Sequence, residues 1–211
     1  MNELRTHFED LARRWDGLQS PERGQRLRDL LVPFAPLLAQ SRTLLEVGTG
    51  TGALIPCLRE RAPGAHLISI DLAAEMLRRA RQRCPDAAVV LADAHDPPFA
   101  TPGFDLIICH NSFPHFADKP ATVSQLARAL RPGGHLLILH DLSRKRINAI
   151  HSSGGPAIQH DLLPPGEETE RMLMRAGFAD VEAEDSDERY VVVGRRAPID
   201  GGGSGNRLAG T

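Results

Sequence analysis

The chain has 211 residues, of which 41% are hydrophobic and 25% charged, and its formal net charge is −2. This composition indicates one globular domain with or without appendages. The small net charge gives no general attraction to nucleic acid. No apolar run reaches the ~20 residues of a membrane span. Cysteines 57, 84 and 109 have neither metal-ligand nor redox-motif spacing, which favours a reduced protein and a cytoplasmic location.

The first 40 residues carry helical patterns and no strand pattern. Apolar residues at helical spacing predict a helix over residues 3–16. A proline at the start predicts a second helix over 22–31, and a short helix leads to Gln40. Because the opening is charged and amphipathic, we expect no secretory signal there.

From residue 43 strands and helices alternate. We expect strands over residues 43–47, 66–70 (closing at Asp71), 88–91, 104–109 and 135–140, with helices over 53–61, 73–83 and 121–130 between them. The run Leu106-Ile107-Ile108 is typical of a strand buried on both faces. This alternation predicts a parallel sheet with right-handed crossovers.

The C-terminal third is less regular. Helices are expected over residues 144–152 and 165–176, and two strands over 181–184 and 189–194 close as a hairpin. The stretch 141–164 has no clear strand, and the Gly-rich stretch 198–211 is expected to be a flexible tail.

The sequence LLEVGTGTG, residues 44–52, predicts a buried strand that runs into a glycine turn and then a helix. Glycine allows positive φ and close approach of the backbone to a ligand, and the helix N-terminus presents unpaired amides. Asp71 and Asp93 close the second and third strands, at the same edge of the sheet. A carboxylate at Asp71 suits both hydroxyls of a ribose, and Asp93 with the backbone of Ala94 suits an adenine edge. These features argue for an adenosine cofactor.

A nicotinamide cofactor would also place a ribose on Asp71, but two features argue against it. The glycines follow G-x-G-x-G and not G-x-G-x-x-G. Glu46, two residues before the first glycine, would repel a pyrophosphate but could serve a cationic ammonium group.

With these motifs the chain resembles the class I S-adenosylmethionine-dependent methyltransferases. The resemblance rests on LLEVGTGTG (44–52), ISIDLAAEML (68–77), LADAHDPPF (91–99), FDLIICHNSFPHF (104–116) and LRPGGHLLILHD (130–141). The phrase HFEDLARRWD is similar to the opening helix of the ubiquinone-biosynthesis-like subgroup.

The resemblance implies an α/β, doubly wound, Rossmann-like sheet of seven strands, mostly parallel, with the last strand antiparallel. It also implies an N-terminal helical lid over residues 1–40 and a cofactor-binding domain over 41–197, with a substrate-side insert at about 141–164.

The resemblance further implies roles for individual residues, with S-adenosylmethionine as cofactor and S-adenosylhomocysteine as product. The methionine part of the cofactor would be held by Glu46, Gly48, Thr49 and Gly50, with Gly52 also in the cofactor-binding turn. The ribose would be bound by Asp71, and the adenine would be contacted by Leu72, Met76, Asp93 and Ala94. The methionine end or the substrate would be faced by His110, Asn111 and Ser112.

The histidines near the strand ends allow three interpretations. A general base is needed only if the methyl acceptor is protonated, and His140 and His115 are the candidates for that base. A metal site of His140, His151 and a third group is the second interpretation, and polar capping of strands and helices is the third. Asp141 follows His140 directly, but neighbouring residues on a strand point oppositely, which argues against their pairing.

We therefore expect a methyltransferase acting on a small molecule, with oxygen as first choice of acceptor atom and sulfur or nitrogen next. Residues 110–113 read His-Asn-Ser-Phe, where enzymes that methylate amino groups of nucleic-acid bases or glutamine carry a characteristic tetrad. This difference disfavours such acceptors. The alternatives are a non-catalytic binder of S-adenosylmethionine or its product, a metal-assisted methyltransferase using the histidines near 140–151, and a nicotinamide-dependent reductase. The expected partner is a small-molecule substrate, with no nucleic acid and no membrane, and a homodimer is one assembly to consider.

Overall fold

The computed structural model describes residues 2–18, 20–99 and 102–198. It contains one sheet of seven strands, β1 (Thr43–Val47), β2 (His66–Asp71), β3 (Ala88–Leu91), β4 (Phe104–His110), β5 (Leu130–His140), β6 (Phe178–Asp185) and β7 (Tyr190–Arg196). The predicted tail, residues 198–211, lies outside the described residues from position 199 onward.

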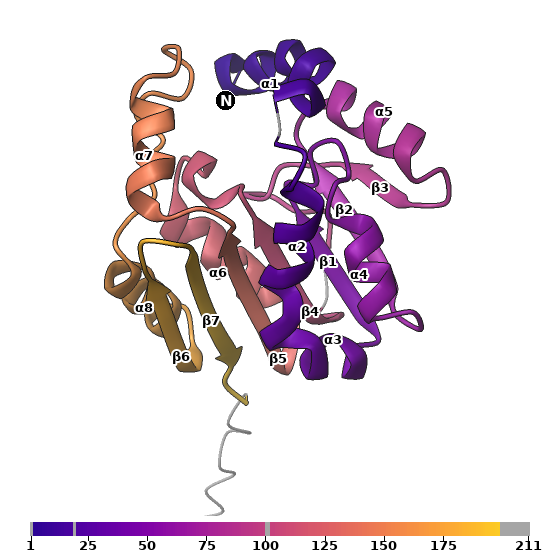
Figure 1. The fold of residues 1–211 in the computed structure, drawn as a ribbon. Helices are drawn as coiled ribbons and strands as arrows, with labels where there is room; N and C mark the ends of the chain where they lie inside the picture. Colours follow the sequence, from indigo (N-terminus) through magenta and orange to yellow (C-terminus); the bar gives the residue numbers. More distant parts are fainter. Residues whose placement is uncertain (1, 19, 100–101, 199–211) are drawn as a thin grey trace, which may run out of the picture.

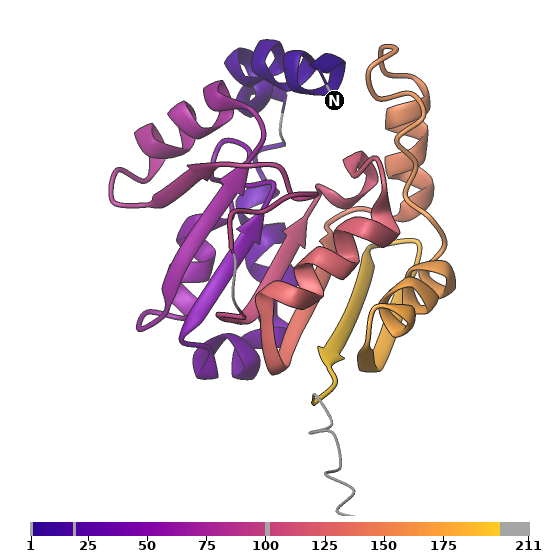
Figure 2. The ribbon, with the colours of Figure 1, turned by 180° about the vertical axis from the view of Figure 1, so that it is seen from behind.

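Helices flank the sheet on both faces (Figures 1 and 2). They are α1 (Asn2–Trp15), α2 (Arg23–Leu31), α3 (Ala35–Gln40), α4 (Ile55–Arg61), α5 (Ala74–Arg83), α6 (Lys119–Ala129), α7 (Arg144–Ser152) and α8 (Gly166–Arg175), with short 3-10 helices η1 (Asp16–Leu18), η2 (Val32–Phe34) and η3 (Phe113–His115). No helix of the described ranges is both long and apolar enough to cross a membrane.

The strand order is β3-β2-β1-β4-β5-β7-β6. The pairs from β3 to β5 are parallel, whereas β7 is antiparallel to both β5 and β6. The chain thus winds outward from β1 in one direction and from β4 in the other, so the order reverses between these two central strands. The predicted doubly wound sheet of seven strands with an antiparallel last strand is confirmed.

Several predicted boundaries shift; β6, for example, begins at Phe178 and not at the predicted Val181. Two of the shifts go with a local feature. Helix α6 begins at Lys119, before the expected Ala121, because the side chain of Asp118 accepts a hydrogen bond from the N–H of Ala121 and caps the helix. Strand β5 begins at Leu130, which pairs with Phe104 ahead of a register shift, whereas the sequence predicted a start five residues later.

Alternation along the strands divides the core between the two faces. Leu45 and Val47 of β1 point to the face covered by α6 and α8 (Figure 2), whereas Leu44 points to the face covered by α2, α3 and α4 (Figure 1). Both sets are almost fully buried, so the sheet is held from both sides, and its carboxyl edge is where a ligand site can form.

The helices of the predicted lid, residues 1–40, take different positions, and Arg23 at the start of α2 reaches the cavity at that edge. Helix α1 crosses above the strand ends (Figure 1), while α2 and α3 pack on the sheet through leucines of their apolar stripes. Helix α7 and the loop after it, within the predicted insert, rise on the opposite side of the same edge, so they face α1 across it (Figures 1 and 2).

Candidate functional site

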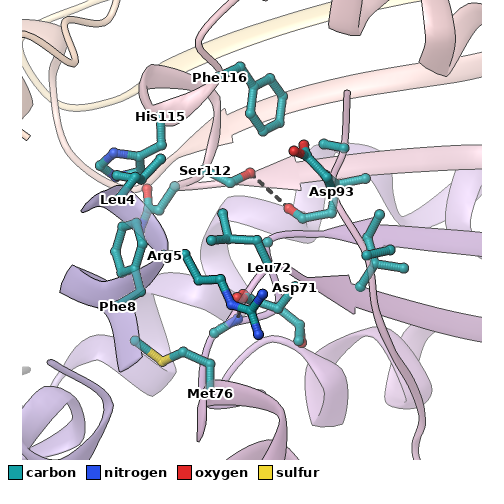
Figure 3. Close-up of a pocket in the computed structure, with 18 of the residues that line it drawn as sticks. Leu4, Arg5, Phe8, Asp71, Leu72, Met76, Asp93, Ser112, His115 and Phe116 are labelled. Carbon is teal, nitrogen blue, oxygen red and sulfur yellow. Dashed lines mark hydrogen bonds between the residues drawn. The ribbon is translucent and has the colours of Figure 1, made fainter. Parts of the chain in front are cut away.

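A cavity of about 940 Å³ lies at the carboxyl ends of β1, β2, β3 and β4, against α1 (Figure 3). Of the residues predicted for a site, those that line it are Gly48, Thr49, Gly50, Asp71, Leu72, Met76, Asp93, Ala94, His110, Asn111 and His115. The structure therefore brings most of the predicted set together. Glu46, Gly52, His140 and His151 are not among the lining residues.

The three glycines of the turn have positive φ, at 77°, 54° and 78° for Gly48, Gly50 and Gly52. A Cβ at Gly48 would collide with the side chain of Ser112, so this glycine lets the loop after β4 approach β1. A Cβ at Gly50 would meet nothing within 4 Å, so the backbone there is open for a ligand to approach. At Gly52 a Cβ would lie 3.0 Å from Cβ of Ala80 on α5, which gives this glycine a packing role.

Glu46 supports the glycine turn through a hydrogen bond from Thr49. Its carboxylate is buried and accepts hydrogen bonds from the hydroxyls of Thr49 at 2.8 Å and Ser69 at 2.7 Å. Burial raises the pKa of Glu46 above its ordinary value. Direct contact with a ligand's ammonium group stays a prediction, because the structure gives this carboxylate a supporting position behind the cavity wall.

Asp71 joins the turn to the start of α5. Its carboxylate accepts hydrogen bonds from the N–H groups of Gly50 at 2.8 Å and Ala73 at 2.9 Å, and it also lines the cavity. Burial raises the pKa of Asp71, although these amides oppose that rise. The backbone therefore holds the carboxylate at the position where the sequence predicted a ribose contact.

The neighbouring wall is made by Leu72, Met76, Asp93 and Ala94. The carboxylate of Asp93 accepts a hydrogen bond from the N–H of His95 at 2.8 Å. Met76 is almost fully buried and packs with Ala12 of α1, so it contributes both to the core and to the cavity wall (Figure 3).

The loop after β4, residues 111–117, is called the post-β4 loop below. Asn111 has a φ of 51°, and its amide donates to the carboxylate of Asp141 at 2.7 Å. Asp141 also accepts from Nε of Arg26 at 3.1 Å, and Nε2 of His110 lies 3.7 Å away. Burial raises the pKa of Asp141, but these contacts outweigh that effect and hold it well below its usual range.

The imidazole of His115 is fixed by groups from three parts of the chain. Nδ1 lies 2.8 Å from a carboxylate oxygen of Asp161, the ring of Phe8 stands edge-on at 4.9 Å, and the ring of His151 lies at 4.8 Å. Burial lowers the pKa of His115 below its ordinary value. Sequence reasoning missed Asp161, because it lies in the insert, where no motif or periodicity marks it.

His140 has a different environment. It is 1% exposed, its ring packs edge-on against Tyr190 at 5.8 Å, and its Nε2 has no hydrogen-bond partner within the described residues. Burial holds its pKa well below the ordinary value. Nδ1 of His151 contacts the backbone carbonyl of Asp161. Among residues 2–18, 20–99 and 102–198, no group of three or more His, Cys, Asp or Glu could hold a metal ion.

Two arginines that sequence reasoning did not single out, Arg5 and Arg23, also line the cavity. The guanidinium of Arg23 lies 5.9 Å from the centre of the Trp15 ring. Arginines are common on exposed helix faces, so neither position carried a signal in the sequence.

The donor set fits a nucleoside linked to an amino acid. Gly50 offers an open backbone surface, Asp71 offers acceptors for hydroxyls, and Nε2 of His110 is a buried nitrogen without a hydrogen-bond partner among the described residues. Such an unpaired buried group is normally matched by a ligand or water.

Comparisons with known proteins agree with this geometry. A family model described as a methyltransferase domain matches residues 45–138. A demethylmenaquinone methyltransferase from Thermus thermophilus is 37% identical over 54% of this chain and 52% of its own length. A malonyl-[acyl-carrier protein] O-methyltransferase from Geobacter sulfurreducens is 29% identical over 99% of this chain and 87% of its own.

A solved structure of a SAM-dependent methyltransferase from Thermotoga maritima matches with a TM-score of 0.73 and 18% identity, over 92% of this chain and 99% of that one. At that identity the likeness shows the fold. The chain spans about half the length of the demethylmenaquinone relatives that it matches.

Proposed function

We propose that this chain is a class I S-adenosylmethionine-dependent methyltransferase, which transfers the methyl group of S-adenosylmethionine to a small molecule and releases S-adenosylhomocysteine. The match of residues 45–138 to the methyltransferase family model and the similarity to named methyltransferases support the proposal. The observation that carries the proposal is that Gly48, Gly50, Asp71 and Asp93 line the same cavity at one edge of the sheet. We refer to the wall formed by residues 48–50, 71, 72, 76 and 91–94 as the cofactor side.

On the cofactor side, Asp71 accepts from the ribose hydroxyls, and Asp93 with the backbone of Ala94 contacts the adenine edge. Leu72 and Met76 pack on the adenine ring. These assignments are supported by the position of all five residues on the cavity wall.

The methionine part lies along Gly48, Thr49 and Gly50, with His110 and Asn111 at the methyl end. Glu46 holds the hydroxyl of Thr49 in place. When bound, the sulfonium of the cofactor supplies a methyl group that is already activated for in-line attack, so the chain's own residues have to position the acceptor and manage its proton.

We extend the proposal to an oxygen acceptor and to action in the cytoplasm. The relatives' names cover more than one kind of acceptor, a demethylmenaquinone and a malonyl-acyl carrier protein, so the acceptor atom has to be argued from this chain. His115 beside the methyl end favours an acceptor that must lose a proton. The three buried free thiols, Cys57, Cys84 and Cys109, are in keeping with a reducing compartment.

Isothermal titration calorimetry with S-adenosylhomocysteine tests the proposal, with NAD as the control ligand. We expect binding of S-adenosylhomocysteine and none of NAD. Absence of S-adenosylhomocysteine binding would overturn the proposal. Formation of S-adenosylhomocysteine from S-adenosylmethionine and a small-molecule acceptor then distinguishes an enzyme from a non-catalytic binding protein.

A further inference from the structure

The part of the cavity away from Asp93 is built mainly from apolar and aromatic side chains. It is lined by Leu4 and Phe8 of α1, His115 of the post-β4 loop, and Ala157 and Asp161 of the insert. We call these five residues the acceptor side. In Figure 3, Leu4, Phe8 and His115 lie on one side of the cavity and Asp93 on the other.

The hydrogen bond between His115 and Asp161 determines where the proton of the imidazole resides. An ionised carboxylate only accepts hydrogen bonds, so Nδ1 of His115 carries the hydrogen that lies on the 2.8 Å line to Asp161. In a neutral ring Nε2 is then the unprotonated nitrogen. The hydrogen bond to Asp161 uses Nδ1, and His115 lines the cavity, so the lone pair of Nε2 is available to a ligand there.

The surroundings of His115 keep the ring rigid and uncharged. Phe8 packs against it from α1 and His151 from α7. The ammonium of Lys119 donates to the carbonyls of Pro114 and Phe116, which fixes the loop that carries the ring. The titratable and charged groups that act on His115 are Asp161 and His151 from the insert, Lys119 from α6 and His140 from β5. His7 on α1 is close enough to Asp161 to be influenced by it.

We propose that His115 is the general base of the reaction, that Asp161 positions it, and that the methyl acceptor is a planar molecule with an ionisable hydroxyl group, such as a phenol or an enol. This inference rests on the proposed function and identifies its substrate class. The aromatic ring of Phe8 on the cavity wall suits a planar acceptor, since aromatic rings pack well edge-on or offset.

A carboxylic acid is the competing acceptor. It is already ionised at neutral pH and needs no base, and its charge would stand close to the carboxylate of Asp161. A phenol, in contrast, keeps its proton at neutral pH, so its hydroxyl needs a neighbouring base. The dyad of His115 and Asp161 therefore favours the hydroxyl over the carboxylate.

The proposed step balances without any other reactant. The hydroxyl proton of the acceptor passes to Nε2 of His115, while the acceptor oxygen forms a bond to the methyl carbon. The carbon–sulfur bond breaks and its electron pair stays on sulfur, which gives the thioether product. The imidazolium then returns its proton to water.

The first test reads the tautomer of His115 directly. Nitrogen-15 NMR of the protein saturated with S-adenosylhomocysteine, with His115→Gln used for assignment, should show a neutral ring protonated at Nδ1 at pH 7. The Asp161→Asn variant should lose this preference. An imidazolium, or a ring protonated at Nε2, in the unaltered protein would contradict the inference.

The second test compares acceptors. S-adenosylhomocysteine formation is measured with 1-naphthol, catechol and 8-hydroxyquinoline, and with 1-naphthoate, benzoate and quinoline-8-carboxylate as the matched acids. We expect methylation of at least one hydroxyl compound and none of the acids. His115→Gln should lower kcat by about 10²–10⁴-fold, and Asp161→Asn should lower kcat by about tenfold or more with KM within about threefold.

His160→Gln is the matched control, because His160 is exposed beside Asp161, and we expect its kcat to stay within about twofold of the unaltered protein. All variants should keep their affinity for S-adenosylhomocysteine. If the unaltered protein does not bind S-adenosylhomocysteine, the proposed function itself is contradicted. If the affinity for S-adenosylhomocysteine is intact, any of three results would overturn this inference and leave the proposed function standing. They are methylation of the acids only, no methylation of the hydroxyl compounds, and full activity of His115→Gln.

Discussion

The cofactor side and the acceptor side of the cavity are built from different kinds of contact. The cofactor side uses the ends of three neighbouring parallel strands and one glycine turn, all within residues 43–94. Hydrogen bonds to two carboxylates hold it together: Glu46 accepts from the hydroxyls of Thr49 and Ser69, and Asp71 accepts from backbone amides. The acceptor side instead joins three separate segments, α1, the post-β4 loop and the insert.

This difference separates a part of the cavity whose geometry the fold determines from a part that depends on individual side chains of distant segments. A site made of strand ends and a short turn depends on local geometry that the parallel sheet dictates. A site made of distant segments depends on side chains such as Phe8, His115 and Asp161, which meet only after the whole chain has folded. The variants below test whether the two sides respond separately.

The largest effect is expected where the two sides touch. Gly48→Ala places a Cβ against the side chain of Ser112, at a φ that L-residues avoid, so we expect a loss of about 3 kcal/mol in the free energy of unfolding. Gly50→Ala, where a Cβ meets nothing within 4 Å, should lose only about 1 kcal/mol but should weaken S-adenosylhomocysteine binding. Urea unfolding and calorimetry measure the two effects. Equal stabilities would show that the approach of Ser112 does not constrain the turn.

Asp71→Ala should act on the cofactor side alone. Two hydrogen bonds from ribose hydroxyls to a charged group, each contributing about 1.5 kcal/mol, correspond to a loss of about 100-fold in affinity for S-adenosylhomocysteine. Asp93→Ala is the comparison and should lose about tenfold, because it removes one contact. Calorimetry gives the affinities and thermal unfolding checks that the variants are folded. Unchanged binding in Asp71→Ala would refute the ribose assignment.

Asp141 connects α2 with the ends of β4 and β5, beneath the boundary between the two sides. Its pKa in the folded state lies below its unfolded value of about 3.9. The unfolded chain therefore binds more protons as the pH falls below about 4. The stabilisation is complete above that pH and is lost as the pH falls through the folded pKa.

We expect Asp141→Asn to be less stable by about 2 kcal/mol at pH 7, from its charged hydrogen bonds, with the difference shrinking below about pH 4. Urea unfolding at pH 7, 5, 4 and 3 measures it. Arg26→Gln is the control and should cost at most about 1 kcal/mol, because the Arg26 side chain is 36% exposed. A difference that stays constant over the whole pH range would argue against the charged network.

The smallest effect on the free energy of unfolding is expected at the contact between Glu9 of α1 and the start of α5, which joins the acceptor side to the cofactor side. The carboxylate of Glu9 on α1 accepts from the N–H groups of Ala74 and Glu75 at 2.8 and 2.7 Å, and Ala73 supplies no side-chain cap to α5. Glu9→Ala should therefore lower the free energy of unfolding by about 1 kcal/mol. Asp10→Ala, an exposed neighbour on α1, should change it by less than about 0.5 kcal/mol. Equal values for both variants would remove Glu9 as an anchor.

The same difference explains what the sequence could predict. All seven strands and the glycine turn follow from apolar runs and turn residues that lie within a few positions of each other. The lining position of Asp71 and Asp93 follows from the rule that parallel strands end at one edge. The argument that Asp141 and His140 point oppositely also agrees with the structure, where Asp141 meets Asn111 while His140 packs on Tyr190.

The acceptor side could be predicted only in part. His115 was a candidate because it follows a strand end, but its partner Asp161 lies 46 residues further along in a segment without periodicity. His140 was preferred on the same grounds as His115, yet burial among β-strand side chains places it off the cavity wall. The predicted lid, residues 1–40, includes α2, whose apolar stripe packs on the sheet face.

The anchoring of α1 on α5 has a practical consequence for protein engineering. The segment that aligns with the methyltransferase family model, residues 45–138, excludes both α1 and the insert. A fragment cut at those limits would expose Met76 where Ala12 now covers it and would leave α5 without Glu9. Chimeras that aim to exchange substrate preference should therefore transplant residues 2–18 and 153–163 as a pair, together with the surface of α5 that receives the first of them.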